Sequence, residues 1–181
     1  MIKAILACDE NGGVGNKGTL PWPHIKRDFQ WFKNNTAGHV VVMGSSTYLD
    51  PDMPKPMPKR KNVVVTTKPE TCPLAHDFIN GDVIEGVRSV EQKYAGLITW
   101  VIGGPNIIEQ TLGIIDEFYI SRIPGEFECD VHLPVRKIES LFERTWSEEH
   151  EDVTFEIWKK RSSKDVITAG RRAVHNGKGL F

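Results

Sequence analysis

The sequence predicts a single α/β domain with a central mixed, mostly parallel β-sheet of about eight strands flanked by about four helices. Short β-branched runs alternate with short helical segments, which favours parallel strands joined by crossover helices. Continuous Val and Ile runs are typical of central strands that are covered on both faces. Two strands near the C-terminal end follow each other closely enough to pair antiparallel, so we expect a mixed sheet.

The first third of the chain predicts two strands around one helix. Residues 2–8 are an apolar run that indicates a buried strand, and the Gly-, Asn- and Pro-rich residues 9–24 predict a long loop. Apolar residues recur with helical spacing over 25–35. A β-branched run at 39–43, closed by Gly44, predicts the second strand, and the prolines of residues 50–61 predict an extended loop.

The rest of the chain continues the alternation. We expect strands at 61–67, 98–102 and 117–123, a short helix near 89–95 and a helix at 105–112. Residues 142–159 are interpreted as two strands around a turn near Glu151-Asp152. From Arg161 the chain becomes polar, basic and Gly-rich, so the predicted domain covers 1–161. Residues 162–181 are interpreted as a polar basic tail, either disordered or an addition to the natural chain.

Length and charge exclude several classes of protein. The chain has 181 residues, 23 Lys and Arg, 24 Asp and Glu, and a formal net charge of −1. This length accommodates one domain whose core needs no metal, and the near-neutral charge argues against a nucleic-acid partner. No apolar stretch approaches the roughly 20 residues that span a bilayer. Three cysteines without a CxxC pair indicate reduced thiols and a cytoplasmic location. We also expect a monomer that does not bind membranes.

One glycine motif matches a known fingerprint but does not support it. Gly13-Val14-Gly15-Asn16-Lys17-Gly18 satisfies GxGxxG after the first strand. The Rossmann mechanism needs a helix to begin there, whereas Pro21 and Pro23 prevent a regular helix. The segment is interpreted either as a plain flexible loop or as a mobile loop that covers a site.

The predicted helix at 25–35 carries an acid on its apolar side. Ile25, Phe29 and Phe32 form a stripe at i, i+4 and i+7, and Asp28 lies beside it. Burial of an unpaired ion costs several kcal/mol, so Asp28 is expected to be paired, protonated or placed at a ligand. One hypothesis is a structural salt bridge or a favourable charge at the helix N-terminus. The other is an acid in an apolar pocket that binds an amidine-like group.

Arg60 and two glycine junctions are further candidates. The planar fork of Arg60 suits a carboxylate, although a solvated basic loop explains it equally well. Gly44-Ser45-Ser46-Thr47 and Gly103-Gly104-Pro105-Asn106 each follow a β-branched or apolar run. Either junction alone is an ordinary glycine turn, but together they suggest a site for the phosphates of a dinucleotide.

Taken together, these segments resemble the dihydrofolate reductase family. The matching segments occur in family order over about residues 1–160, and this collinearity is more specific than any single motif. They are Leu20-Pro21-Trp22, Asp28-Phe29-Gln30-Trp31-Phe32-Lys33, Val42-Met43-Gly44 with Thr47-Tyr48, Pro58-Lys59-Arg60-Lys61-Asn62, Val101-Ile102-Gly103-Gly104, Tyr119-Ile120-Ser121-Arg122-Ile123, and Cys129-Asp130-Val131-His132-Leu133-Pro134.

The resemblance implies the family's fold and the NADPH-dependent reduction of 7,8-dihydrofolate to 5,6,7,8-tetrahydrofolate. This reaction serves one-carbon metabolism and thymidylate and purine synthesis, and the family is a target of antifolates. Asp28 matches the acid that binds the pterin, and Arg60 matches the arginine that binds the glutamate tail of folate. Trp22 would fix a water near Asp28, Leu20 would close over the nicotinamide, and Ser121 stands where a threonine usually bonds the acid.

The resemblance also assigns two larger sets of residues. The substrate set, besides Asp28, Arg60 and Ser121, comprises Ile5, Ala7, Phe29, Phe32, Lys33, Met53, Met57 and Ile102. The cofactor set comprises Ala7, Val14, Gly15, Asn16, Gly18, Thr19, Gly44, Ser45, Ser46, Thr47, Thr66, Thr67, Lys68, Ile102, Gly103, Gly104, Pro105, Asn106, Ile107 and Ile108. A non-proline cis peptide is expected between Gly103 and Gly104.

The chain departs from the family pattern at several positions. Ser45 and Asn106 stand where the family often has basic residues that bind the cofactor's 2′-phosphate, so Thr66, Thr67 and Lys68 would have to compensate. Lys59 replaces a common glycine, and Pro23-His24 lengthens the link to Asp28. Two alternatives remain: a reductase of the same fold that acts on another pteridine or a pyrimidine precursor, and a non-catalytic subunit of an assembly.

Overall fold

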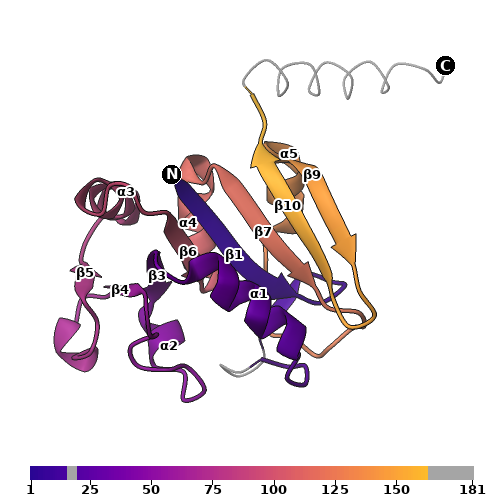
Figure 1. Cartoon of the computed structure of the whole chain (residues 1–181), viewed down its shortest axis with the longest axis horizontal. Coiled ribbons are helices and arrows are strands. Elements are labelled where there is room, and N and C mark those ends of the chain that lie inside the picture. Colours follow the sequence, from indigo (N-terminus) through magenta and orange to yellow (C-terminus); the bar gives the residue numbers. More distant parts are fainter. Residues whose placement is uncertain (16–19, 163–181) are drawn as a thin grey trace.

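An eight-stranded sheet organises the chain, in the order β5-β4-β3-β6-β1-β7-β10-β9 (Figure 1). The computed structural model describes residues 1–15 and 20–162. The predictions on Asn16, Gly18 and Thr19, and all of the predicted tail except Ser162, therefore lie outside the described residues. The strands of the sheet are β1 (Ile2–Cys8), β3 (Val40–Gly44), β4 (Lys61–Val65), β5 (Asp77–Ile79), β6 (Thr99–Gly103), β7 (Glu117–Arg122), β9 (Phe142–Glu149) and β10 (Thr154–Lys160).

The predicted mixed sheet is confirmed. Strand β1 pairs parallel with both β6 and β7, and β3 pairs parallel with β4 and β6. Strand β10 pairs antiparallel with β7 on one side and with β9 on the other. Because β1, β3 and β6 are parallel neighbours, their carboxyl ends meet at one edge of the sheet, where open α/β sheets bind ligands.

Helices cover both faces of the sheet. Helix α1 (Lys26–Thr36) lies over one face, whereas α4 (Pro105–Thr111) and α5 (Val135–Leu141) lie behind the other (Figure 1). Helix α3 (Val83–Lys93) packs against α4, and the short α2 (Ser45–Tyr48) follows β3 directly. Side chains of β1 alternate between the layers: Ala4 packs with α4, and Ile5 packs with the side chains of α1.

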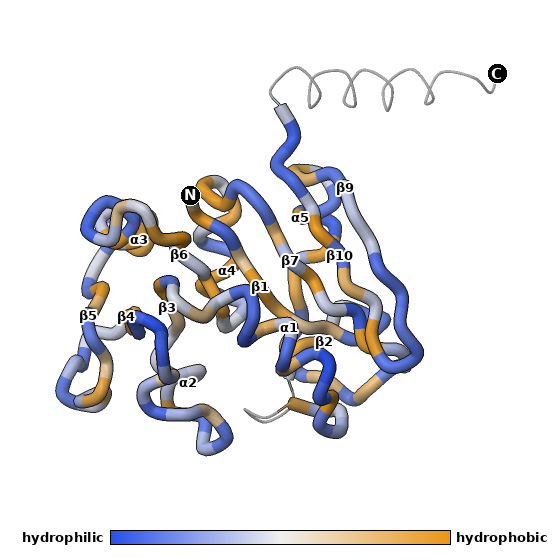
Figure 2. The backbone as a smooth tube through the Cα atoms, in the orientation of Figure 1, coloured by the Kyte–Doolittle hydropathy of each residue, from blue (hydrophilic) through white to orange (hydrophobic). Residues whose placement is uncertain are grey.

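The apolar side chains follow this layering. The tube in Figure 2 is most hydrophobic along the central strands, while the edge strand β9 is largely polar. The core on the α3/α4/α5 side contains Val42, Val101, Ile108 and Phe118, all fully buried. The core on the α1 side is smaller and contains more aromatic and sulfur-bearing side chains, and it continues toward the carboxyl ends of β1, β3 and β6.

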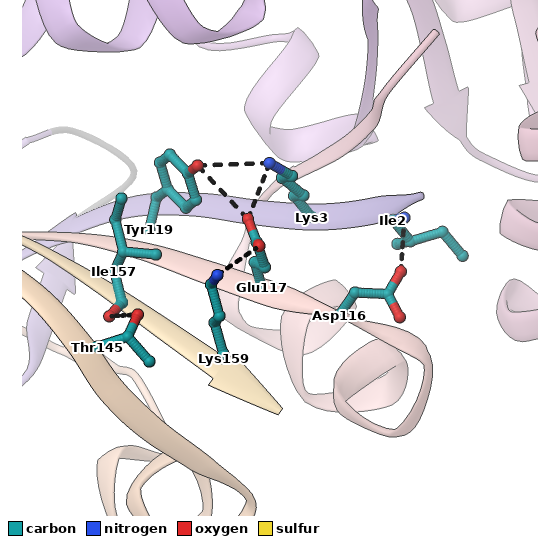
Figure 3. A network of polar contacts seen from close by, with 8 residues as sticks. All are labelled: Ile2, Lys3, Asp116, Glu117, Tyr119, Thr145, Ile157 and Lys159. Atoms are coloured by element: carbon teal, nitrogen blue, oxygen red, sulfur yellow. Dashed lines mark hydrogen bonds and ion pairs between the residues drawn. The ribbon is translucent and has the colours of Figure 1, made fainter. Parts of the chain in front are cut away.

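A polar network closes the opposite end of the α1 face (Figure 3). Lys3 Nζ lies 2.8 Å from Glu117 Oε2 and 3.4 Å from the Tyr119 hydroxyl, and Lys159 Nζ lies 3.8 Å from Glu117 Oε1. Lys3 on β1 is the register partner of Glu117 on β7, and four residues further on Ala7 is the partner of Ser121. The same two strands thus carry a closed polar cluster at one end and the candidate site at the other.

Several predicted boundaries were wrong. The helix predicted near 89–95 begins at Val83, because the side chain of Asp82 accepts a hydrogen bond from Glu85 N at 2.9 Å and caps it. The predicted loop 9–24 contains the short strand β2 (Gly13–Gly15), which pairs with β8 (Val131–His132). The elements α2, β5 and β8, and two 3₁₀ turns at Pro69–Thr71 and Leu112–Ile114, were not predicted because each is too short to show a period. Helix α5 was not predicted either.

Candidate active site

Asp28 lies in the first turn of α1, facing the sheet. The backbone amides of Asp28 and Phe29 both donate to the Ile25 carbonyl, at 3.1 and 3.2 Å, and so fix the start of the helix. Ser121, only 1% exposed on β7, hydrogen-bonds the Asp28 side chain. An acid and a hydroxyl from different elements are therefore joined at the end of the α1 face.

The surroundings of Asp28 favour its protonated form. Burial raises the pKa of the Asp28 carboxyl above its ordinary value, and the hydrogen bond from Ser121 opposes this shift only in part. The negative charge of Asp152 raises the pKa further. No ion pair of Asp28 with a lysine or arginine is found among the described residues, which counts against the hypothesis of a structural salt bridge.

An apolar wall stands beside this acid. Ile5, Met57 and Ile102 are buried in one cluster, and Phe32 and Met53 pack against it half-buried. Five residues of the predicted substrate set are thus brought together. Ala7 packs in the neighbouring cluster that contains Trp22, which is itself buried.

Three predicted residues are exposed and do not belong to this buried wall. Phe29 is 47% exposed and its ring lies 4.3 Å from the ring of His24, so it does not enclose Asp28 as the stripe predicted. The physical reason is that Ile25 precedes the helix as its N-cap, so the stripe is shorter than its spacing suggested. Lys33 is exposed on α1, and Leu20 is 49% exposed.

Trp31 is the aromatic residue that packs between α1 and the sheet on the same side of the helix as Asp28. Its ring stacks on Phe155 at 4.4 Å and on Trp146 at 5.7 Å. Because Trp31 follows Asp28 by three residues, both side chains leave α1 on the same side. Trp31 therefore fastens the helix that carries the acid to strands β9 and β10.

Arg60 reaches the same wall from the loop before β4. Its guanidinium lies 5.8 Å from the Phe32 ring centroid, and its Nε is buried with no hydrogen-bond partner among the described residues. Burial lowers the pKa of Arg60, but a guanidinium remains charged. A buried, charged donor of this kind is available to bind an anion.

Asn62, which the sequence showed only as part of a motif, holds this loop in shape. Its amide accepts from Met57 N at 2.8 Å and donates to the carbonyls of Met57 and Arg60, both at 3.0 Å. Asn62 thereby fixes one residue of the apolar wall and the candidate anion ligand together. A lone asparagine at a strand start gives no pattern from which this role can be predicted.

The two glycine junctions lie side by side. Met43 of β3 is the register partner of Gly103 of β6, so Gly44 and Gly103 end neighbouring strands. The Gly103–Gly104 peptide is cis, as expected from the resemblance. A Cβ added to Gly103 or to Gly104 would lie about 4 Å from the Thr47 hydroxyl. A Cβ added to Gly44 would lie 3.4 Å from the Ile107 side chain. Gly44 and Gly103 are buried, and the partly exposed Gly104 and Thr47 beside them offer backbone and hydroxyl groups that suit a phosphate.

An open cavity of about 430 Å³ lies beyond the first junction. It brings Ser45 of α2 together with Thr66, Thr67 and Lys68, which follow β4. Lys68 is the one cation among the described residues that line it, and Thr71 adds another hydroxyl. Asn106 does not line this cavity and its side chain accepts from Gln110 at 3.1 Å. Ile107 and Ile108 turn their side chains into the core beneath the strands.

The glycine loop after β1 is held by an acid that was not predicted. The buried Asp9 carboxylate accepts from Asn11 N, Gly13 N and Phe127 N at 2.8–3.0 Å. Burial would raise the pKa of Asp9, but these three backbone donors outweigh it and lower the pKa. Val14 is buried and Gly15 pairs with Val131, so this part of the loop is ordered by tertiary contacts.

Comparisons with known proteins identify the class. The chain matches the dihydrofolate reductase family over residues 1–163. It is 34% identical to a dihydrofolate reductase of Bacillus subtilis over 135 residues, which cover 74% of this chain and 76% of that one. It is 29% identical to the type 8 dihydrofolate reductase of Escherichia coli over 165 residues, which cover 88% and 96% of the two chains.

A solved structure has the same fold. Dihydrofolate reductase from Enterococcus faecalis, complexed with NADP(H) and RAB-propyl, superposes with a TM-score of 0.74 at 24% identity, over 90% of this chain and 97% of that one. Fold and sequence thus agree on an α/β oxidoreductase. The chain belongs to the dihydrofolate reductase family.

The position of Lys59 yields a stability prediction. Lys59 has a φ of 61°, a left-handed conformation that favours glycine. We expect Lys59→Gly to raise the free energy of unfolding by up to about 1 kcal/mol, because relief of strain exceeds the added freedom of the unfolded chain. Urea denaturation measures this, with Lys61→Gly in β4 as a control that should destabilise by about 1 kcal/mol. Equal losses in both variants would contradict the assignment of strain to Lys59.

Proposed function

We propose that Asp28, Ser121 and Arg60, with the apolar wall between them, form the dihydrofolate site of this enzyme. As a member of its family the chain reduces 7,8-dihydrofolate to 5,6,7,8-tetrahydrofolate with NADPH, for one-carbon metabolism. The proposal is carried by two polar groups that lie on either side of one apolar cluster. One is the half-buried acid Asp28, which forms no ion pair with a lysine or arginine among the described residues. The other is the buried guanidinium donor of Arg60.

Asp28 recognises the nitrogen edge of the pterin. The two oxygens of Asp28 accept hydrogen bonds from the 2-amino group and from N3 of the pterin. These two N–H groups supply the hydrogen-bond partners that the carboxylate lacks in the free protein. The negative charge on Asp28 also favours a proton on N5, which arrives through water. The buried Trp22 is proposed to help fix this water beside Asp28.

Arg60 and the wall hold the rest of the substrate. The guanidinium binds the α-carboxylate of the glutamate tail, which pairs the buried Nε that has no partner among the described residues. Ile5, Phe32 and Met57 contact the flat rings and exclude water from them. Met53 and Ile102 complete this surface.

The glycine cradle and the open cavity suit the cofactor. We propose that Gly44, Gly103, Gly104 and Thr47 hold the pyrophosphate, since the two glycine junctions lie side by side and the Thr47 hydroxyl lies next to Gly103 and Gly104. Ser45 and residues 66–68 hold the 2′-phosphate at the cavity. NADPH, when bound, supplies the hydride that reduces C6. Val14, Gly15, Ser46 and Pro105 remain proposed contacts, and Leu20 is proposed to close over the nicotinamide.

The alternative reductases of this fold are disfavoured by the same residues. An enzyme that acts on another pteridine or on a pyrimidine precursor needs no site for a glutamate tail, whereas Arg60 carries a buried donor without a partner among the described residues. A non-catalytic subunit would not need to retain a desolvated acid. Competitive inhibition by methotrexate tests the first alternative, and NADPH oxidation with dihydrofolate tests the second.

We further propose that the protein works as a cytoplasmic monomer. All three cysteines are free, and Cys8 and Cys72 are buried, which fits a reducing compartment. Burial raises the pKa of the Cys8 thiol to about 11, so this thiol is inert. Within the described ranges no helix is long and apolar enough to cross a bilayer.

Replacement of the acid is the central test. We expect Asp28→Asn to lower the rate of dihydrofolate reduction at pH 7 by about 100-fold or more, because the amide cannot carry the charge that supports a proton on N5. The rate should recover toward low pH, where the substrate is already protonated. Single-turnover rates between pH 5 and 8 measure this, and an unchanged rate at pH 7 refutes the role of Asp28.

The same variant should be more stable than the parent. Because burial raises the pKa of Asp28, the folded chain binds more protons than the unfolded chain above the ordinary carboxyl value of 3.8. Stability therefore falls as the pH rises through this window, and Asp28→Asn removes the loss. Urea denaturation at pH 4 and 7 should show a larger gain at pH 7, and such a gain would show that lost activity is not lost folding.

Arg60→Leu tests the site for the glutamate tail. Loss of a buried charged partner should weaken folate binding by roughly 2–5 kcal/mol. Binding of a pterin without the glutamate tail should change little, as measured by fluorescence titration. Lys59→Ala, which removes the neighbouring exposed cation, is the matched control. Equal losses for both ligands would show that Arg60 supports the fold and not the tail.

Lys68→Ala tests the preference for NADPH. Lys68 is the one cation among the described residues that line the cavity, so its loss should weaken NADPH binding roughly tenfold, the effect of one hydrogen bond to a charged group. NADH, which lacks the 2′-phosphate, should bind as before. Fluorescence titration of both nucleotides measures this, with the exposed Lys61→Ala as control. A parallel loss for both nucleotides would place the 2′-phosphate elsewhere.

A further inference from the structure

The turn between β9 and β10 lies beside the first turn of α1. Phe155 of β10 is the register partner of Ser121 and stacks on Trp31 at 4.4 Å, so this hairpin flanks the acid's hydrogen-bond partner. Three residues earlier, Asp152 Oδ1 lies 3.1 Å from Nε of Arg27, the residue next to Asp28. The hairpin thus contacts α1 at two places along the helix: at Trp31 through an aromatic stack, and at Arg27 through an ion pair.

The charge of Asp152 reaches the catalytic acid. Charged and titratable groups on the surrounding elements are Lys26 and Arg27 on α1, His24 before it, Arg122 on β7, Glu156 on β10, and His150, Glu151 and Asp152 in the turn. Arg122 and Glu156 pair with each other at 2.8 Å, and His150 Nε2 lies 3.6 Å from Glu148. Among these groups, Asp152 is the one whose charge raises the pKa of Asp28.

We propose that Asp152 is a positioning residue for Asp28, which holds Arg27 against the hairpin and places a second negative charge beside the catalytic acid. This inference rests on the proposed role of Asp28. Arg27 and Asp152 are 49% and 47% exposed, so the pair adds little to folding stability. Its consequence is electrostatic: a nearby like charge disfavours ionisation of Asp28, and Arg27 limits this effect by neutralising part of the charge.

The experiment measures the titration of Asp28 directly. In Asp152→Asn, the carboxyl ¹³C titration midpoint of Asp28, assigned by its absence in Asp28→Asn, should fall by roughly 0.2–0.7 pH units at low ionic strength. The shift should shrink in 0.5 M salt, because exposed charges are screened. In Arg27→Gln the midpoint should rise, since the charge of Asp152 is no longer partly neutralised.

The neighbouring Glu151→Gln is the matched control, because it removes one carboxylate from the same exposed turn. A midpoint in Asp152→Asn that equals the parent's overturns the proposal, and so does an equal fall in Glu151→Gln. A uniform loss of rate at every pH with an unmoved midpoint assigns Asp152 a purely structural role, which also overturns it. Failure of the proposed function is read separately, from an unchanged rate of Asp28→Asn at pH 7.

Discussion

The proposed site depends on the carboxyl group of Asp28, which is largely removed from water and has too few hydrogen-bond partners in the folded chain. The folded chain gives Asp28 one hydroxyl from Ser121 and no cation among the described residues, so its ionised form is disfavoured. A buried acid in this state costs stability. The same deficit makes the acid selective, because a ligand that presents two N–H groups in one plane supplies the missing partners. The proposed recognition of the pterin and the expected loss of stability are therefore two consequences of one desolvated side chain.

Other parts of the chain hold the groups around this acid in place. Ser121 is fixed by the register of β7 between β1 and β10, and Trp31 fixes α1 against the hairpin. Asn62 bonds the loop that carries Met57 and Arg60. These contacts come from four segments far apart in sequence. Preorganisation of this kind reduces the ordering that binding would otherwise require.

The fold and the acid could be predicted because they leave local patterns. The β-branched runs, the helical spacing around Asp28 and the order of the motifs are all visible in one dimension. The contacts that hold the site residues in place leave no local sequence pattern. Asp9, Asn62 and Asp152 act through backbone amides and side chains that only the folded chain brings near, and Phe29 shows that an apolar stripe does not distinguish a core from a surface. Short elements such as α2 and β8 are likewise defined by their tertiary neighbours.

The proposed cofactor cavity replaces a missing residue type with a different chemistry. With Ser45 where a basic residue is common, the first junction offers a phosphate only hydroxyl and backbone donors, and Lys68 adds charge from the adjacent strand end. Hydrogen bonds to a charged group contribute about 1.5–3 kcal/mol each, so several hydroxyls can hold a phosphate without a second cation. A single cation, however, makes binding less sensitive to salt than a cluster would. If the proposed 2′-phosphate site is correct, preference for NADPH depends on geometry at two strand ends more than on net charge.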